Sequence, residues 1–121
     1  MKIGELNITA IAKKELPEEV IEDFRKGCSI LIYVYCEYNL SENLIREFQD
    51  KVNWYWISIE QNLSEDFIRE FQDRVNWDNI CYKQNLSKEF IMEFVDKIVF
   101  DSILDNENIS KEVKDYCRMF L

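Results

Sequence analysis

Residues 39–61 read NLSENLIREFQDKVNWYWISIEQ, and residues 62–84 repeat them as NLSEDFIREFQDRVNWDNICYKQ, with 15 of 23 positions identical. Residues 85–107, NLSKEFIMEFVDKIVFDSILDNE, keep ten of the 23 residues of the preceding copy. A fixed period that is held over consecutive copies is the signature of a tandem repeat array. The chain is therefore predicted to fold as a series of similar structural repeats.

The remaining sequence extends this array in both directions. Residues 15–38 keep the apolar spacing with one inserted residue, since Phe24 lies 24 positions before Phe48. Residues 1–14 match the second half of a repeat, and residues 108–121 match the first half. We therefore predict a single helical repeat domain over residues 1–121, made of half-repeat 1–14, repeats 15–38, 39–61, 62–84 and 85–107, and terminal half-repeat 108–121.

The first half of each repeat has the pattern of a capped helix. Ser41 precedes the apolar stripe of Leu44, Ile45, Phe48 and Val52, and a serine hydroxyl is a good acceptor for an exposed helix N–H. The same place is filled in the other copies by Pro17, Ser64, Ser87 and Ser110. A helix of about three turns is predicted, with its last turn closed by Lys51, Arg74 or Lys97.

The second half predicts another short helix. Asn53 and Asn76 are competent N-caps, and each is followed by a tryptophan and, three residues later, an isoleucine. These helices should end near Gln61-Asn62 and Gln84-Asn85, where asparagine in the left-handed conformation would replace a missing glycine.

Residues 29–38 carry two conflicting signals. They are rich in β-branched and aromatic residues, which favours a strand. Leu31 and Val34, however, fall at the repeat positions of Trp54 and Ile57, which favours a buried helix. We give more weight to the repeat and predict a helix. The predicted fold class is all-α, a short α-solenoid of 23-residue helical hairpins whose aromatic columns form the core.

Composition excludes several classes of function. The 121 residues contain 24 acidic and 15 basic residues, a net charge of −9, which disfavours direct binding to nucleic acid or to an anionic membrane. The absence of histidine removes the usual general base and zinc ligand, and two glycines cannot build a phosphate-binding loop. The longest apolar run, residues 30–36, is far shorter than the ~20 residues of a membrane span.

The cysteines and the paired carboxylates are the remaining candidates for chemical sites. Cys28, Cys36, Cys81 and Cys117 form no CxxC pair, so they are predicted to be reduced core thiols of a cytoplasmic protein. Acids three residues apart could bind a cation or transfer protons, and they occur at Glu47/Asp50, Glu70/Asp73 and Glu93/Asp96. A solvated helix face explains these pairs better, so no enzyme activity, metal or cofactor is predicted.

The copies differ most in the second helix. Tyr55 becomes Asp78 and Asp101, whereas Ile59 becomes Tyr82 and Asp105. Positions that stacking leaves free can specialise, and one row of helices in a solenoid commonly lines a binding surface. The candidate partner-binding residues are Tyr55, Trp56, Ile59, Asp78, Tyr82 and Lys83. The alternative is that these residues drifted at solvated positions, or that Trp56 packs between repeats.

The pattern LSExFIREFxDKVNWxxIxxxQ, present in residues 40–61 and 63–84, resembles short two-helix repeats in proteins of giant DNA viruses, with similar stretches in phage and bacterial proteins. The resemblance covers residues 39–107 and departs from the pattern at Val99 and Phe100. It implies a fold and a viral or mobile-element source, and it carries no catalytic residues.

These observations predict a non-enzymatic protein–protein interaction module. With the resemblance, they suggest a cytoplasmic viral or phage protein, a monomer or small homo-oligomer, that inhibits a host defence protein. One alternative is an acidic mimic of nucleic acid, since residues 85–107 alone carry a charge of −4. A second alternative is a structural or virion protein that self-associates through Tyr116, Phe120 and Leu121.

Overall fold

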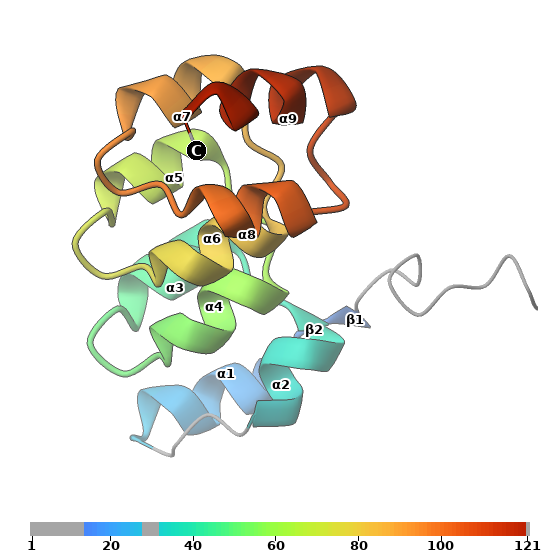
Figure 1. The fold of residues 1–121 in the computed structure, drawn as a ribbon. Coiled ribbons are helices and arrows are strands. Elements are labelled where there is room, and N and C mark those ends of the chain that lie inside the picture. The colour runs from blue at the N-terminus through green and yellow to red at the C-terminus, as the bar shows by residue number, and fades with distance from the viewer. Residues whose placement is uncertain (1–13, 28–31, 121) are drawn as a thin grey trace, which may run out of the picture. The chain divides into compact units, whose positions relative to one another are not determined.

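The computed structural model describes residues 14–27 and 32–120, and most of these residues are helical (Figure 1). The chain divides between Lys51 and Val52 into two compact parts, here called the N-terminal part and the C-terminal part. Residues 1–13 of the predicted first half-repeat lie outside the described residues, as do Cys28, Leu31 and Leu121.

In its described residues, 14–27 and 32–51, the N-terminal part combines three helices with a very small parallel sheet. Its elements are β1 (Lys14–Glu15), α1 (Glu18–Arg25), α2 (Ile32–Glu37), β2 (Tyr38–Asn39) and α3 (Glu42–Glu47). Lys14 lies opposite Tyr38 and Glu15 opposite Asn39. Gly27, with φ +93°, follows α1 in a conformation that favours glycine. Phe24 and Phe48 are buried, with their rings edge to face and 5.9 Å apart.

The ambiguous segment is helical, as the repeat predicted, over residues 32–37, where Val34 and Tyr35 are buried. The short strand pair of β1 and β2 was not predicted, but the described part of the chain is mostly helical and compatible with the predicted all-α class. Each strand has only two residues and lies just before a repeat's first helix, whose cap residue (Pro17 or Ser41) is itself extended. A pairing this short leaves no periodic pattern in the sequence.

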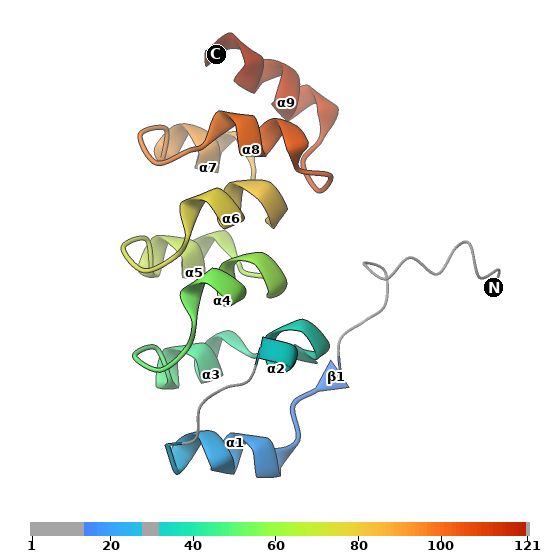
Figure 2. The same cartoon turned by 60° about the horizontal axis from the view of Figure 1, so that its bottom comes forward.

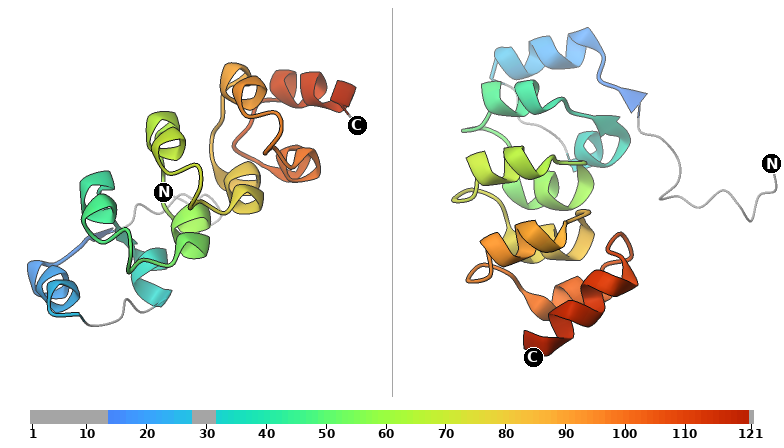
Figure 3. Two further views of the ribbon diagram at one scale, coloured as in Figure 1. Left: turned by 90° about the vertical axis from the view of Figure 1, so that its left-hand side faces the viewer. Right: turned by 90° about the horizontal axis from the view of Figure 1, so that it is seen from above.

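The C-terminal part is built from helices alone in its described residues. These are α4 (Trp54–Glu60), α5 (Glu65–Glu70), α6 (Trp77–Lys83), α7 (Lys88–Glu93), α8 (Phe100–Asp105), α9 (Lys111–Cys117) and a 3₁₀ turn (Arg118–Phe120). Helix α4 packs against α6, and α6 packs against α8, which places these three helices in one row with α5 and α7 behind it (Figure 2). Helix α9 packs on α8 and is turned relative to α7 (Figure 3).

The predicted N-caps are confirmed. The hydroxyls of Ser41, Ser64, Ser87 and Ser110 each accept a hydrogen bond from the backbone N–H three residues later. The side chains of Asn53 and Asn76 cap α4 and α6 in the same way. Val99 occupies the equivalent place before α8 without a side-chain cap, as its apolar side chain requires.

The first helices are shorter than predicted. Helices α3, α5 and α7 each have six residues rather than three turns, so Lys51, Arg74 and Lys97 lie in the turn that follows. In α5 the helix stops at Phe71, which has φ −109° and ψ 29°, and Arg74 N–H donates back to the Phe71 carbonyl at 2.9 Å. The side chain of Gln72 donates to the Arg69 carbonyl, which satisfies one of the orphan acceptors of this helix end.

The second helices end at the predicted positions, Gln61 and Gln84, but not in the predicted conformation. No non-glycine residue in the described ranges has a positive φ, so Asn62 and Asn85 are not left-handed terminators. The chain instead leaves the helix through an extended residue, Gln61 with ψ 144° or Gln84 with ψ 149°. An extended exit leaves the last carbonyls without intrahelical partners, and other groups must bond them.

Buried side-chain amides supply these missing partners. Gln84 Nε2 donates to the Ser58 and Gln61 carbonyls at 2.9 and 2.7 Å, and Gln84 Oε1 accepts from Leu63 N–H at 3.1 Å. Each of these bonds joins the exit of α6 to the exit of α4. The side chain of Asn106 does the same for the next pair, donating to the Cys81 and Gln84 carbonyls at 2.8 Å. We call Gln84 and Asn106 the amide clamps.

A second contact joins the later half of one helix in this row to the start of the next. Ser58 Oγ accepts a hydrogen bond from Asn76 N–H at 2.9 Å, just before α6. Cys81, 23 residues after Ser58, uses its sulfur to accept from Val99 N–H at 3.4 Å, just before α8. Ser58 and Cys81 therefore occupy the same repeat position and accept the equivalent hydrogen bond.

Aromatic rings fill the space between the two rows. Trp54 packs on Phe71 with ring centroids 5.1 Å apart, and Trp77 repeats this contact on Phe94 at 5.2 Å. The predicted tryptophan and phenylalanine columns therefore meet in the core, although both tryptophans are only half-buried. The equivalent ring of Phe100 stacks on Phe120 at 5.3 Å.

The amide clamp predicts a specific loss of stability. Replacing Gln84 by methionine keeps the side-chain size but leaves two carbonyls and one N–H without this partner. We expect Gln84→Met to lower the free energy of unfolding by about 2–4 kcal/mol, measured by urea denaturation. The matched control is Asn85→Ala, which should change stability little because Asn85 is exposed and not left-handed. The reverse order of the two variants would show that asparagine, not glutamine, terminates the helix.

Candidate functional site

Six positions on α4, α6 and α8 form a regular surface that we call the second-helix face. Tyr55 and Ile59 are four residues apart on α4, so they share one side of that helix. The same two repeat positions hold Asp78 and Tyr82 on α6, and Asp101 and Asp105 on α8. Because α4, α6 and α8 pack in that order, the residues lie in two parallel rows.

The chemistry of this face changes along each row. One row runs from Tyr55 through Asp78 to Asp101, and the other from Ile59 through Tyr82 to Asp105. Tyr55 and Tyr82 are 47% and 44% exposed, and the three aspartates are exposed as well. Few large hydrophobic side chains are exposed in the described residues, and the others are Val99, Met119 and Phe120. The face is therefore aromatic at α4 and acidic at α8.

The position of Trp56 favours the alternative that this residue packs between repeats. It is half-buried, and its ring meets the Tyr55 ring edge to face at 5.2 Å. The equivalent residues hold neighbouring helices together, since Asn79 Nδ2 donates to the Tyr55 carbonyl at 3.0 Å and Ser102 Oγ donates to Asp78 Oδ1. This repeat position is therefore constrained by stacking, as the alternative interpretation of Trp56 has it. Trp56 supports the Tyr55 ring from the side.

The other predicted residues divide between the face and its edge. Tyr55, Ile59, Asp78 and Tyr82 come together on the face, whereas Lys83 is half-buried at its edge, where its carbonyl accepts from Asn108 Nδ2 at 2.7 Å. Sequence reasoning missed Asp101 and Asp105 as members. The signal was available, because these residues replace Tyr55 and Ile59 at the same repeat positions.

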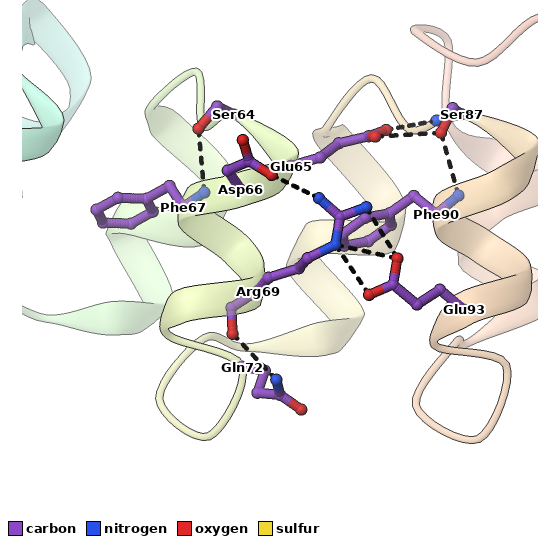
Figure 4. A network of polar contacts seen from close by, with 9 residues as sticks. All are labelled: Ser64, Glu65, Asp66, Phe67, Arg69, Gln72, Ser87, Phe90 and Glu93. Atoms are coloured by element: carbon purple, nitrogen blue, oxygen red, sulfur yellow. Dashed lines mark hydrogen bonds and ion pairs between the residues drawn. The ribbon is translucent and has the colours of Figure 1, made fainter.

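Carboxylates on the first helices form a separate polar network that bridges α5 and α7 (Figure 4). Glu65 accepts from Ser87 N–H at 2.7 Å and from Ser87 Oγ at 3.1 Å. Arg69 donates to both oxygens of Glu93, the shortest distance being 2.8 Å, and to Asp66 at 2.7 Å. The hydrogen bond from Arg69 lowers the pKa of the Glu93 carboxyl. These acids connect neighbouring repeats.

The predicted carboxylate pairs also have cationic neighbours. Glu93 is engaged by Arg69, and Asp73 lies 3.6 Å from Lys97 Nζ. Within residues 14–27 and 32–120, no group of three or more acidic or cysteine side chains is arranged to hold a metal ion. The arrangement matches the interpretation of these acids as a solvated, ion-paired helix surface.

The thiols fall into two environments. Cys36 is exposed, whereas Cys81 and Cys117 are buried, and all three are free thiols. Burial raises the pKa of the Cys81 thiol to about 11 and also raises the pKa of Cys117. Because the thiolate is the nucleophilic form, the raised pKa values and the burial of these two groups both disfavour their reaction at neutral pH.

No helix in the described part of the chain is long and apolar enough to cross a membrane. Comparison of the sequence with protein-family models and with curated proteins, and of the fold with solved structures, finds no match.

Thiol environments predict an order of modification. In a Cys28→Ser variant at pH 8, we expect Cys36 to react rapidly with an aromatic disulfide reagent. Cys81 and Cys117 should react only when the protein is unfolded, because their raised pKa values and burial keep them protonated and covered. Mass spectrometry of the labelled peptides measures this order. Rapid native labelling of Cys81 would contradict the packing between α6 and α8.

Proposed function

We propose that this chain is a short, non-enzymatic α-solenoid that binds a protein partner through the second-helix face. The observation that carries the proposal is the pair of exposed tyrosines, Tyr55 and Tyr82, on neighbouring packed helices. Tyrosine is enriched among residues that dominate binding energy, since its ring buries a large area and its hydroxyl tolerates a polar rim.

The solenoid part of the proposal rests on contacts that recur with the sequence period. Trp54 on Phe71 is repeated by Trp77 on Phe94, and Ser58 to Asn76 is repeated by Cys81 to Val99. In a solenoid each repeat contacts its neighbours in the same way. These four contacts all lie within the C-terminal part, and the repeats of the N-terminal part extend the proposal by sequence.

A preformed surface supports binding without large ordering costs. The helices that carry the tyrosines are joined by the amide clamp of Gln84 and by the Asn79 side chain. Fixing the binding groups before association reduces the entropy lost on binding. The proposed mechanism is occlusion or scaffolding of the partner by this surface.

The repeat motif's resemblance to viral and phage proteins extends the proposal to the partner's origin. We propose a host protein, with a defence component as the first candidate, bound in the cytoplasm. The free thiols among the described cysteines support a reducing compartment.

The test is partner capture with two matched variants. We expect Tyr55→Ala combined with Tyr82→Ala to reduce capture of a partner from host lysate at least tenfold, since each truncation at a hot spot costs about 2 kcal/mol or more. Met119→Ala is the control, because Met119 is 75% exposed and lies outside the face. Helical circular dichroism should be unchanged in both variants. Equal capture by all three proteins would refute the proposed face.

Washing at low and high salt separates this proposal from the acidic-mimic alternative. Partners held by tyrosines should survive high salt, because apolar contacts are not screened. A partner that is lost at high salt and displaced by DNA or RNA would favour the mimic. Concentration-dependent sedimentation, abolished by Phe120→Ala, would favour self-association.

A further inference from the structure

We infer that the second-helix face, if it binds a partner as proposed above, recognises one extended protein segment with an apolar side chain at one end and Lys or Arg at the other. The inference rests on the proposed function and adds the chemistry of the partner. Its basis is the change from aromatic to acidic side chains between α4 and α8.

The α4 end of the face provides the apolar contacts. Tyr55 and Ile59 stand one turn apart on α4, and Tyr82 lies beside Ile59 in the same row. The Trp56 ring packs against Tyr55 from the side, which limits the motion of this ring. An aliphatic or aromatic side chain of the partner would bury apolar surface of Tyr55, Ile59 and Tyr82 from water.

The α8 end provides negative charge. Helices α4, α6 and α8 contain five charged residues, of which only Lys83 is basic. Asp101 and Asp105 are both exposed, and no ion pair or hydrogen bond engages either side chain within the described residues. Asp78 lies between the two ends and is oriented by Ser102. The unneutralised carboxylates complement a cationic side chain at the opposite end of the segment from the apolar anchor.

The spacing of the helices sets the length of the segment. Packed helices are about 8–10 Å apart, so two such steps from α4 to α8 span about 16–20 Å. An extended chain rises about 3.3 Å per residue, so it covers this distance in about five or six residues. The apolar anchor and the basic residue should therefore lie about five or six positions apart, with about four or five residues between them.

Selection from a random 12-residue peptide library, displayed on phage, tests this inference without knowledge of the natural partner. Enriched peptides should contain an apolar and a basic residue at the stated spacing. One enriched peptide is then synthesised with its Lys and Arg intact or replaced by Gln. Its dissociation constant is measured by fluorescence anisotropy against the full chain and its variants.

Asp101→Asn combined with Asp105→Asn should weaken binding of the intact peptide about tenfold and leave the Gln peptide unaffected. The matched control is Glu89→Gln combined with Asp96→Asn, which removes the same charge from exposed acids outside the face and should leave affinity unchanged. Circular dichroism and urea unfolding confirm that each variant is folded.

The outcomes distinguish the inference from the proposed function. Binding that requires Tyr55 and Tyr82 but tolerates both asparagine substitutions would overturn the inference and leave the proposed function standing. Binding that is unchanged by the tyrosine substitutions as well would overturn both the inference and the proposed function. Enriched peptides without basic residues, or no enrichment at all, would overturn the inference of a linear basic segment.

Discussion

The hydrogen bonds of two buried side-chain amides set the arrangement of the C-terminal part. Gln84 and Asn106 bond the carbonyls that an extended helix exit leaves open, and each amide belongs to a neighbouring repeat. The chain has only two glycines, so left-handed helix ends of the usual kind are scarce. The open carbonyls at the end of a helix in one repeat are thus bonded by a side chain of the next repeat. Each helix end therefore depends on the stacking of neighbouring repeats. Helices of six or seven residues, which are too short to be stable alone, are thereby stabilised.

The surface follows from the same constraint. Once the clamps fix α4, α6 and α8 in one register, equivalent repeat positions must fall in straight rows. Tyr55, Asp78 and Asp101 then stand in line, although no two of them are close in sequence. Substitutions at one repeat position change the chemistry of a continuous surface step by step, without disturbing the contacts beneath it.

The sequence predicted those features that depend on a single residue or on the period. Serine and asparagine caps, the helix over residues 32–37 and the tryptophan column belong to this group. It did not predict the six-residue length of α5, because apolar spacing continues through Val75 although the backbone has already turned at Phe71. Nor could it find Asn106 as a clamp, since this residue is shifted by one position from Gln84. For Trp56 the sequence left two interpretations open, because variation between copies does not distinguish a free surface position from one that packs differently in each repeat.

Ser58 and Cys81 occupy the same repeat position, but the hydrogen bonds that they accept from the next helix of the row are not equally strong. A serine oxygen holds Asn76 N–H at 2.9 Å, whereas the thiol holds Val99 N–H at 3.4 Å, and sulfur is the weaker acceptor. Val99 also lacks the side-chain cap that Asn76 provides. The first turn of α8 should therefore unfold locally more easily than the first turn of α6. The acidic end of the surface can therefore adjust its position more freely than the neighbouring α6, which carries Tyr82.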